Sequence, residues 1–533
     1  MATHPFHLSF AVDDLDRARR FYGDVLECPI RHEGEDSIDF DFFGHLISAR
    51  LDTGGTRILQ RPDGGAVSLW SFGVSLDDDR WEALAAMLSR AGDMLSDHPS
   101  ISRDRLVLRD PAGNALEFTL QRDLAAPIAA NDSDALGATI DVGAIGATLT
   151  AVTMGIDAFE RSRPRGTSLL DGEGLVPIYL GTDVVPARRY ANWDQVQEDL
   201  AGLETSVGQV PEGPRTVFLR DMLTSLKVAV RLFAGASPSF EEKVRDLVGA
   251  PTGPVDPAVI EDIRGRLDSL LRRQGAVRGD LGERIRAWEE GRFVDPARLE
   301  ATFTELLAEA RARTDARIID TGGYEMALNP VRDVPFTARC NFNQGQMDLN
   351  VDQRFTRPAL KHLVCHEVHP GHVTQLLYTR AEVEAGRSEA DALLCTANAV
   401  TGCVQEGIGD QAVQLIDWIE DEDDQIHLEL RRLRSAAQTS AAWHLMVDGW
   451  AADRVAEYLR RTAFGQEAWI QGRLRMAAHP FRGPFIASYW AGNESVRRVR
   501  ERVPAAQRPS FLAYLYGQVH SPESLEMFPP ATP

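Results

Sequence analysis

The sequence predicts a multidomain protein, with an α+β N-terminal domain followed by a large, mostly α-helical domain that holds a short β segment. Three observations predict this class. The chain has 533 residues, too many for one hydrophobic core. Residues 1–121 repeat one order of strand and helix patterns, whereas the patterns after residue 150 are almost all helical. Residues 122–140 are small, polar and without periodicity, so they predict a linker between domains at 1–121 and 141–533.

The N-terminal domain shows the same pattern twice. Short apolar or alternating runs predict strands, and apolar residues at helical spacing predict the helix between them. A D-P-A-G-N turn separates the last two strands. The first round consists of a strand at 7–12, a helix at 13–26 and strands within 37–51; the second consists of a strand at 69–76, a helix at 77–92 and strands within 105–120.

The C-terminal domain is predicted to be helical with one exception. Segments such as 215–235 and 295–315 are amphipathic with a period of 3.6 residues. Residues 334–355 instead alternate and contain Asn and Gly, which predicts strands directly before a cluster of histidines.

Composition limits the function classes. The formal charge of −22 argues against a phosphate-contacting face, so neither nucleic acid nor an anionic membrane is expected as a partner. Five cysteines without a C-x-x-C pair indicate free thiols in a reducing compartment. The N-terminus lacks the pattern of a signal peptide, and no uninterrupted apolar run approaches ~18 residues. We therefore expect a cytoplasmic protein; a homodimer stays open.

The chemistry concentrates in "HLVCHEVHPGHVTQ", residues 362–375. His366 and the adjacent Glu367 match the start of the zinc pattern H-E-x-x-H, in which the glutamate acts as general base. The position four residues after His366 is Pro370, so the usual second ligand is missing. Zinc in a hydrolase takes three protein ligands and keeps one open position.

Two ligand sets remain open at this stage. On an unbroken helix six residues advance by about 600°, so His372 would point away from His366. Pro370 and Gly371 should bend or bulge the helix, which could return His372 to that face. Alternatively His362, His366 and His369 share one face. Glu406 ends an apolar helical stretch, where an unpaired carboxylate is costly, so it is a candidate third ligand.

The N-terminal domain resembles the vicinal-oxygen-chelate superfamily of glyoxalases and extradiol dioxygenases. The likeness rests on "FHLSFAVDDLDRARRFYGDVL", "DFDFFGHLISARL", "FGVSL" and "DPAGNALEF". It implies paired βαβββ modules around a cleft, with a metal site at His7, a residue near Ser71, and Glu117. Serine is a poor ligand for such a metal, so His45 is a candidate replacement. The resemblance thus allows a second divalent metal here, or an inactive binding module.

The C-terminal domain resembles the metallopeptidase-like domain-of-unknown-function family 885. Its H-E-x-x-P-G-H signature is matched by "HEVHPGH", and later motifs by "QEGIGDQ", "RRLRSAAQTSAAWHLMVDGW" and "SYWAG". The resemblance implies a metal held by His366, His372 and Glu406. Gly409, Ser440 and His369 depart from the family's pattern.

These features predict a zinc-dependent hydrolase of an amide or peptide-like bond. Glu367 would activate metal-bound water and pass the proton to the leaving nitrogen. His444 and Tyr489 are candidate donors to the developing oxyanion, and a strand within 336–351 could pair with an extended substrate. The alternative is a metal-dependent lyase, isomerase or dioxygenase acting on a small oxygenated metabolite in the N-terminal cleft, or a non-catalytic binding or dimerisation module there.

Overall fold

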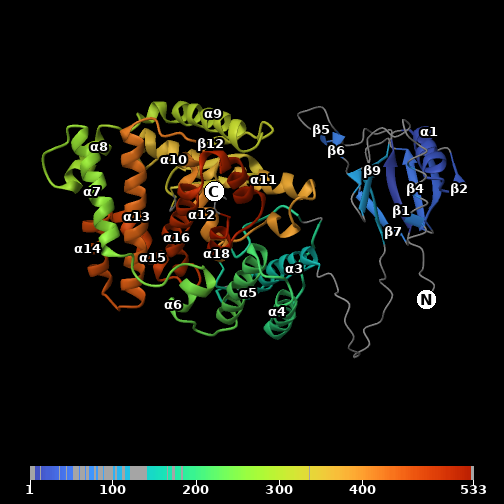
Figure 1. Cartoon of the computed structure of the whole chain (residues 1–533), viewed down its shortest axis with the longest axis horizontal. Helices are drawn as coiled ribbons and strands as arrows, with labels where there is room; N and C mark the ends of the chain where they lie inside the picture. Colours follow the sequence, from blue (N-terminus) through green and yellow to red (C-terminus); the bar gives the residue numbers. More distant parts are fainter. Residues whose placement is uncertain are drawn as a thin grey trace. The chain divides into compact units, whose positions relative to one another are not determined.

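The chain separates into two compact units, which we call the N-terminal unit (residues 1–137) and the helical unit (residues 138–533) (Figure 1). Predicted boundary residues 121–140 lie outside the described part of the chain. The computed structural model describes residues 7–12, 14–34, 36–43, 45–51, 59–60, 66–67, 71–76, 80–81, 84, 88, 100–101, 105–110, 115–120, 141–164, 166–170, 174–181, 184–334 and 337–529.

Two four-stranded sheets of equal topology form the N-terminal unit. Their orders are β1-β4-β3-β2 and β7-β10-β9-β8, and in each the first strand pairs parallel with the last. The repeated strand pattern of the sequence is therefore a repeat of strand order, while the predicted helix at 77–92 lies mostly outside the described residues. A short hairpin of β5 and β6 is separate. The elements are β1 (His7–Val12), α1 (Leu15–Ala18), η1 (Arg19–Val25), β2 (Ile30–Glu33), β3 (Ser37–Phe42), β4 (His45–Leu51), β5 (Leu59–Gln60), β6 (Ala66–Val67), β7 (Ser71–Leu76), β8 (Ser100–Ile101), β9 (Arg105–Arg109) and β10 (Ala115–Leu120).

One apolar core joins both sheets of the N-terminal unit. Phe10 of β1, Phe40 of β3 and Phe118 of β10 are almost completely buried in it, together with Tyr22 of η1. The hydroxyl of Tyr22 donates a hydrogen bond to Asp110, so the buried phenol is satisfied.

The helical unit is built from packed helices and one three-stranded sheet (Figure 1). Its strands are β11 (Ile178–Tyr179), β12 (Ala327–Val331), β13 (Ala338–Asn341), β14 (Gln346–Asn350) and β15 (Leu394–Cys395). Its α-helices are α3 (Val142–Arg161), α4 (Trp193–Val207), α5 (Pro214–Phe233), α6 (Phe240–Glu242), α7 (Pro257–Arg273), α8 (Leu281–Glu290), α9 (Leu299–Arg317), α10 (Arg357–Glu367), α11 (His372–Glu384), α12 (Val400–Leu415), α13 (Glu422–Met446), α14 (Ala452–Thr462), α15 (Glu467–Ala477), α16 (Ser488–Arg502), α17 (Arg508–Gly517) and α18 (Pro522–Glu526). Shorter helical turns are η3 (Lys243–Leu247), η4 (Pro296–Arg298), η5 (Phe342–Gln344), η6 (Ala390–Leu393), η7 (Gly483–Ala487) and η8 (Ala505–Gln507).

Helix α3 is long and apolar enough to cross a membrane, with a mean hydropathy of 1.5 over its best window. Its apolar face packs into the core of the helical unit through Leu149, Val152 and Ile156. Its acidic groups are also inside the fold, where Asp157 accepts from the backbone N–H of Leu175. These contacts are those of a core helix, although the sequence analysis did not single this segment out.

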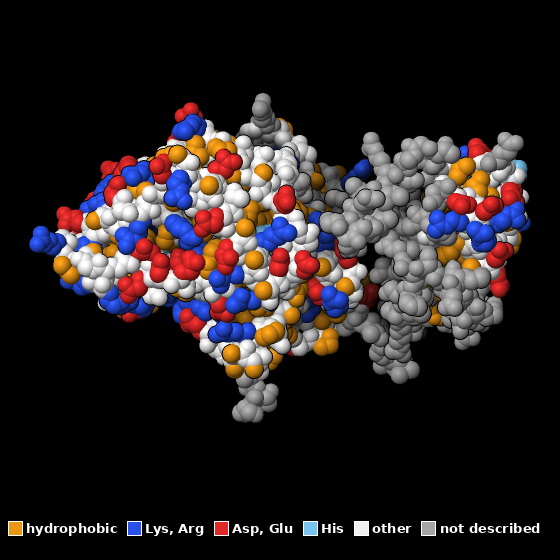
Figure 2. Space-filling view, turned by 90° about the horizontal axis from the view of Figure 1, so that it is seen from above, with side chains coloured by type: hydrophobic (Ala, Val, Ile, Leu, Met, Phe, Trp, Pro, Cys, Tyr) orange, Lys and Arg blue, Asp and Glu red, His pale blue; other side chains and the backbone are white. Residues whose placement is uncertain are grey.

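The surface of the helical unit is mixed in charge. Figure 2 shows acidic and basic side chains interspersed over the described part of the face that it presents. The formal charge of −22 is therefore not gathered into one acidic patch on that face.

Candidate metal centre

A break between two helices brings His366 and His372 together. Helix α10 ends at Glu367, and α11 begins at His372. The expected bend or bulge in one helix is therefore wrong, because the chain starts a new helix instead. Gly371 is required at the junction, since a Cβ there would lie 1.7 Å from the carbonyl oxygen of His366. The two imidazole rings lie 4.8 Å apart between centroids and nearly perpendicular, at 86°.

Glu406 of α12 completes the group. Its Oε2 lies 3.3 Å from Nε2 of His366, and the candidate ligand atoms of His366, His372 and Glu406 are all within 4.8 Å of one another. In a tetrahedral zinc site with bonds of ~2.1 Å, two ligand atoms are about 3.4 Å apart. The structure thus places the three residues named from the sequence around one point, on three different helices.

Glycines allow this close approach. A Cβ at Gly409 would lie 2.6 Å from Nδ1 of His366, so only glycine leaves room for the imidazole beside α12. On the other side of α12, a Cβ at Gly407 would meet the backbone of Gly492 at 2.2 Å. Helices α12 and α16 therefore pack backbone to backbone, which fixes the position of Glu406.

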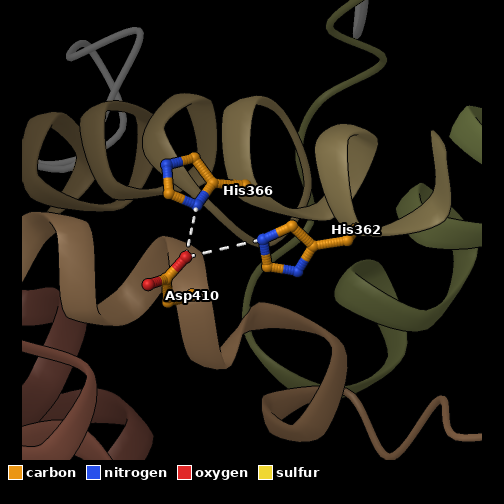
Figure 3. A group of neighbouring side chains, drawn as sticks. All are labelled: His362, His366 and Asp410. Carbon is orange, nitrogen blue, oxygen red and sulfur yellow. Dashed lines mark ion pairs between the residues drawn. The ribbon is translucent and has the colours of Figure 1, made fainter. Parts of the chain in front are cut away.

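Asp410 holds the other nitrogen of His366. Its Oδ1 lies 3.4 Å from Nδ1 of His366 and 3.5 Å from Nε2 of His362 (Figure 3). Arg431 of α13 donates to the same oxygen at 2.7 Å. Asp410 was not among the residues predicted from the sequence. The available signal was its spacing, because it follows Glu406 by one helical turn and so lies on the same face of α12.

Burial and neighbouring charges set opposite protonation states for the histidines. Burial disfavours the charged form of His366, but Asp410 and Glu406 outweigh it and raise its pKa to about 10. Burial and the Arg431 charge lower the pKa of His362 to about 4. Burial, together with His366, lowers the pKa of His372. The Arg431 and histidine contacts hold the pKa of Asp410 well below its usual range despite burial.

The residues present fit a divalent metal. Among the described residues, Oε2 of Glu406 is buried and has no well-formed hydrogen bond, and it faces Nε2 of His366 at 3.3 Å. In the metal-free protein the protonated His366 compensates this charge, and a bound divalent cation would take over that role. The set of two imidazoles and one carboxylate is a common one for catalytic zinc. Asp410 would then fix the orientation of His366, as an acidic partner behind a metal-bound histidine commonly does.

Glu367 lies beside the same point, next to an edge strand. It ends α10 and is partly exposed, and its charge contributes to the raised pKa of His366 and opposes the lowering of the pKa of His372. It also acts on Cys340 of β13, which places that strand near the carboxylate. The sheet order β12-β14-β13 makes β13 an edge strand of its sheet. The segment predicted to hold strands, residues 334–355, contains β13 and β14. Of these, β13 lies close to Glu367.

Of the remaining candidates, His369 lies away from the candidate metal ligands and Tyr489 lies close to them. His369 is buried away from the group, with Nδ1 2.9 Å from the hydroxyl of Thr374, so the alternative three-histidine face does not form. Tyr489 of α16 is near the site, since it lies close enough to influence the pKa of Arg431 and Arg473, two arginines that Glu406 also influences.

His444 requires a correction. Arg431 of α13 contacts Asp410, while Thr439, further along α13, contacts Ile486, whose neighbour Phe485 packs against Gly402 at the start of α12. Helix α13 therefore runs antiparallel to α12, the level of Glu406 falls near residue 435, and His444 lies nine residues further, about 13 Å along the axis. There it stacks on Trp450 and contacts Asp448 at 2.6 Å. The motif match placed it in the site, but the length of the helix carries it away.

The predicted N-terminal ligands fall partly outside the described structure. His7 and Glu117 lie on β1 and β10, but their side chains are not among those described. His45 begins β4, and the register pairs His7 with Leu46. Position 45 therefore belongs to the opposite face of the sheet from position 7, which argues against His45 as the replacement ligand.

Comparisons with known proteins give partial structural matches only. No family model matches the chain, and no curated protein matches it. Among solved structures, the chain is similar to the "putative lipoprotein from Colwellia psychrerythraea" (TM-score 0.45, 14% identity), with 65% of this chain and 63% of that one covered. The chain thus spans less than two thirds of that protein's length.

Small, N-terminal-sized parts match structures of the glyoxalase, bleomycin-resistance and dioxygenase group. One is a glyoxalase/bleomycin resistance protein/dioxygenase from Alicyclobacillus acidocaldarius (TM-score 0.20, 27% identity, 23% of this chain and 96% of that one). Another is the fosfomycin resistance protein FosX from Mesorhizobium loti (TM-score 0.18, 16% identity, 23% and 94%). These low scores say nothing of activity. The predicted likeness of the helical unit to a metallopeptidase-like family finds no support in these comparisons and stays a prediction.

Proposed function

We propose that the helical unit is a zinc-dependent hydrolase of an amide or peptide-like bond. The observation that carries the proposal is the convergence of His366, His372 and Glu406 on one point, with Glu367 beside it. When bound, zinc would polarise a carbonyl group and lower the pKa of a coordinated water. His366 and His372 would bind it as neutral imidazoles, and Glu406 as a carboxylate.

The residues of this chain supply proton transfer and positioning. Glu367 takes a proton from the attacking water and returns it to the leaving nitrogen. Tyr489 is the candidate donor to the oxyanion that develops on the carbonyl oxygen. As an outer strand of the described three-stranded sheet, β13 would offer backbone groups to an extended, peptide-like substrate.

A single substitution tests the proposal. In Glu367→Gln the metal content should match that of the unchanged protein, while hydrolysis of a panel of blocked dipeptides should fall by at least about 100-fold. Glu384→Gln at the end of α11 is a matched control and should keep full activity. Full activity of Glu367→Gln with metal bound would exclude the mechanism.

A second candidate places a reaction in the N-terminal unit. The two sheets of equal order support a glyoxalase-like, paired βαβββ architecture. On this reading the unit is a metal-dependent lyase, isomerase or dioxygenase, or else a binding or dimerisation module. Metal analysis separates the cases: two ions per chain that fall to one in His7→Ala favour a catalytic N-terminal site, and one ion unaffected by His7→Ala favours an accessory module.

A further inference from the structure

Two arginines near the candidate metal ligands have side-chain N–H donors without a hydrogen-bond partner among the described residues. Nε of Arg431 and Nε of Arg473 are both buried, and neither has a hydrogen-bond partner among the described residues. Arg431 is committed through Nη2 to Asp410, whereas the described residues provide no carboxylate within ion-pair distance of Arg473. Leaving such donors unmatched is costly, so their retention points to a ligand that uses them.

The helix geometry places Arg473 at the level of Glu406. Gln438 follows Arg431 by seven residues on α13, so both lie on the same face of that helix. Arg431 contacts Asp410, and the antiparallel course of α12 places Glu406 between the levels of Arg431 and Gln438. Arg473 of α15 reaches Gln438 at 3.4 Å, beside Trp469.

With a metal bound, the net charge near the site would be positive, which favours the binding of an anion. Glu406 and Arg431 are charged groups near enough to act on Arg473, and Tyr489 also influences its pKa. Burial, with repulsion from Arg431, lowers the pKa of Arg473. With a divalent metal bound, the ion and these two guanidinium groups carry four positive charges, against three on the carboxylates of Glu367, Glu406 and Asp410. A negatively charged substrate group would balance the difference and relieve the repulsion.

We propose that Arg473, assisted by Arg431, forms an anion subsite beside the metal ligands, and that the substrate carries a carboxylate next to the bond that is cleaved. A guanidinium group matches a carboxylate with two parallel N–H donors. Substrates of this class are acylated amino acids and peptides cut at their C-terminal residue. The inference rests on the proposed hydrolase function and narrows its substrate class.

The test compares three probes on the zinc-loaded full chain at fixed ionic strength. Acetohydroxamate reports the metal alone; succinic acid monohydroxamate adds a carboxylate, and its terminal amide removes that charge. Calorimetry should show the acid binding about 10- to 100-fold more tightly than the amide. Arg473→Met should abolish this preference while acetohydroxamate binds unchanged. Arg475→Met is the matched control, because Arg475 is an exposed residue of the same helix, and it should keep the preference.

The outcomes are distinguishable. Equal affinity for acid and amide, or a preference that persists in Arg473→Met, overturns the anion subsite and leaves the hydrolase proposal standing. Failure of all three hydroxamates to bind the zinc-loaded protein overturns the metal site, and the subsite with it. Arg473→Lys adds a check on geometry: it keeps the charge but lacks the planar fork, so it should recover only part of the preference.

Discussion

Glu406 and Asp410 lie one turn apart on α12 and face opposite nitrogens of His366, yet their surroundings differ. Asp410 is fully buried and already receives Arg431 at 2.7 Å. Glu406 is partly exposed, and its Oε2 has no hydrogen-bond partner among the described residues. Asp410 thus has an arginine partner as well as His366, whereas among the described residues the ion pair of Glu406 is with His366 alone, whose proton a bound cation would replace. On this comparison Glu406 is the candidate ligand for a cation, and Asp410 is the residue that would position the histidine.

By distance alone, the residues around Asp410 and the residues around Glu406 both form candidate metal sites. His362, His366 and Asp410 are close enough to share an ion, as are His366, His372 and Glu406. Only the second group includes a carboxylate without an arginine partner among the described residues, and residues that are partly exposed to solvent. We therefore expect substitutions on the two sides to differ in size, and four predictions test this.

The largest effect is expected for Glu406→Gln. Structural zinc sites with four ligands bind with ~10–16 kcal/mol, so one ligand contributes roughly 10²- to 10³-fold in affinity. Loss of this size should appear in competition with a chromophoric chelator at constant pH. A variant that binds zinc as tightly as the unchanged protein would assign the ion to the Asp410 side instead.

Asp410→Asn should weaken the metal less, by about 10- to 100-fold, since it removes the partner that orients His366 rather than a ligand. The same chelator competition measures it. Asp424→Asn is the control, because Asp424 is another buried carboxylate in a pair, with Lys361 at 2.6 Å. It should lower the melting temperature and leave metal affinity unchanged.

Metal affinity should rise about tenfold per pH unit through the neutral range. In the metal-free protein the pKa of His366 is about 10, so this ring is charged there and must lose a proton to bind zinc. His362, with a pKa of about 4, has none to lose. Calorimetry in buffers of different ionisation enthalpy should therefore detect one proton released per ion; a value of zero would contradict the assignment.

The same shift has a consequence for stability. Because the pKa of His366 is raised in the folded state, its contribution to the stability of the metal-free protein is complete below about pH 6.5 and is lost as the pH rises toward 10.

The smallest effect is expected for His362→Gln. His362 contacts Asp410 and not the point shared by His372 and Glu406, so zinc affinity should change by less than about tenfold. Metal analysis after dialysis gives a first answer, and chelator competition a number. A loss as large as that of Glu406→Gln would show that the buried group holds the ion.

Much of the fold was predictable because it depends on local periodicity. Alternation and helical spacing predicted two rounds of strand and helix in the N-terminal unit, and the two sheets have the same strand order. The strand-like segment before the histidines contains β13 and β14. At Pro370, where a bend was expected, the chain instead forms two separate helices. The backbone hydrogen bond that proline cannot make predicts an interruption of the helix, but it does not predict the conformation that follows.

The sequence by itself determined which chemical groups are available at the site. These are His366 with an adjacent Glu367, a helix interrupted at Pro370, and a carboxylate at Glu406. Only the tertiary structure decided which of these side chains meet. His369 and His444 lie away from the candidate ligands, whereas Asp410 and Arg473 lie near them. The positions of His444, Asp410 and Arg473 follow from how α12, α13, α15 and α16 pack. Contacts between residues distant in the chain depend on the close approach that Gly407, Gly409 and Gly492 permit, and no local pattern records that approach.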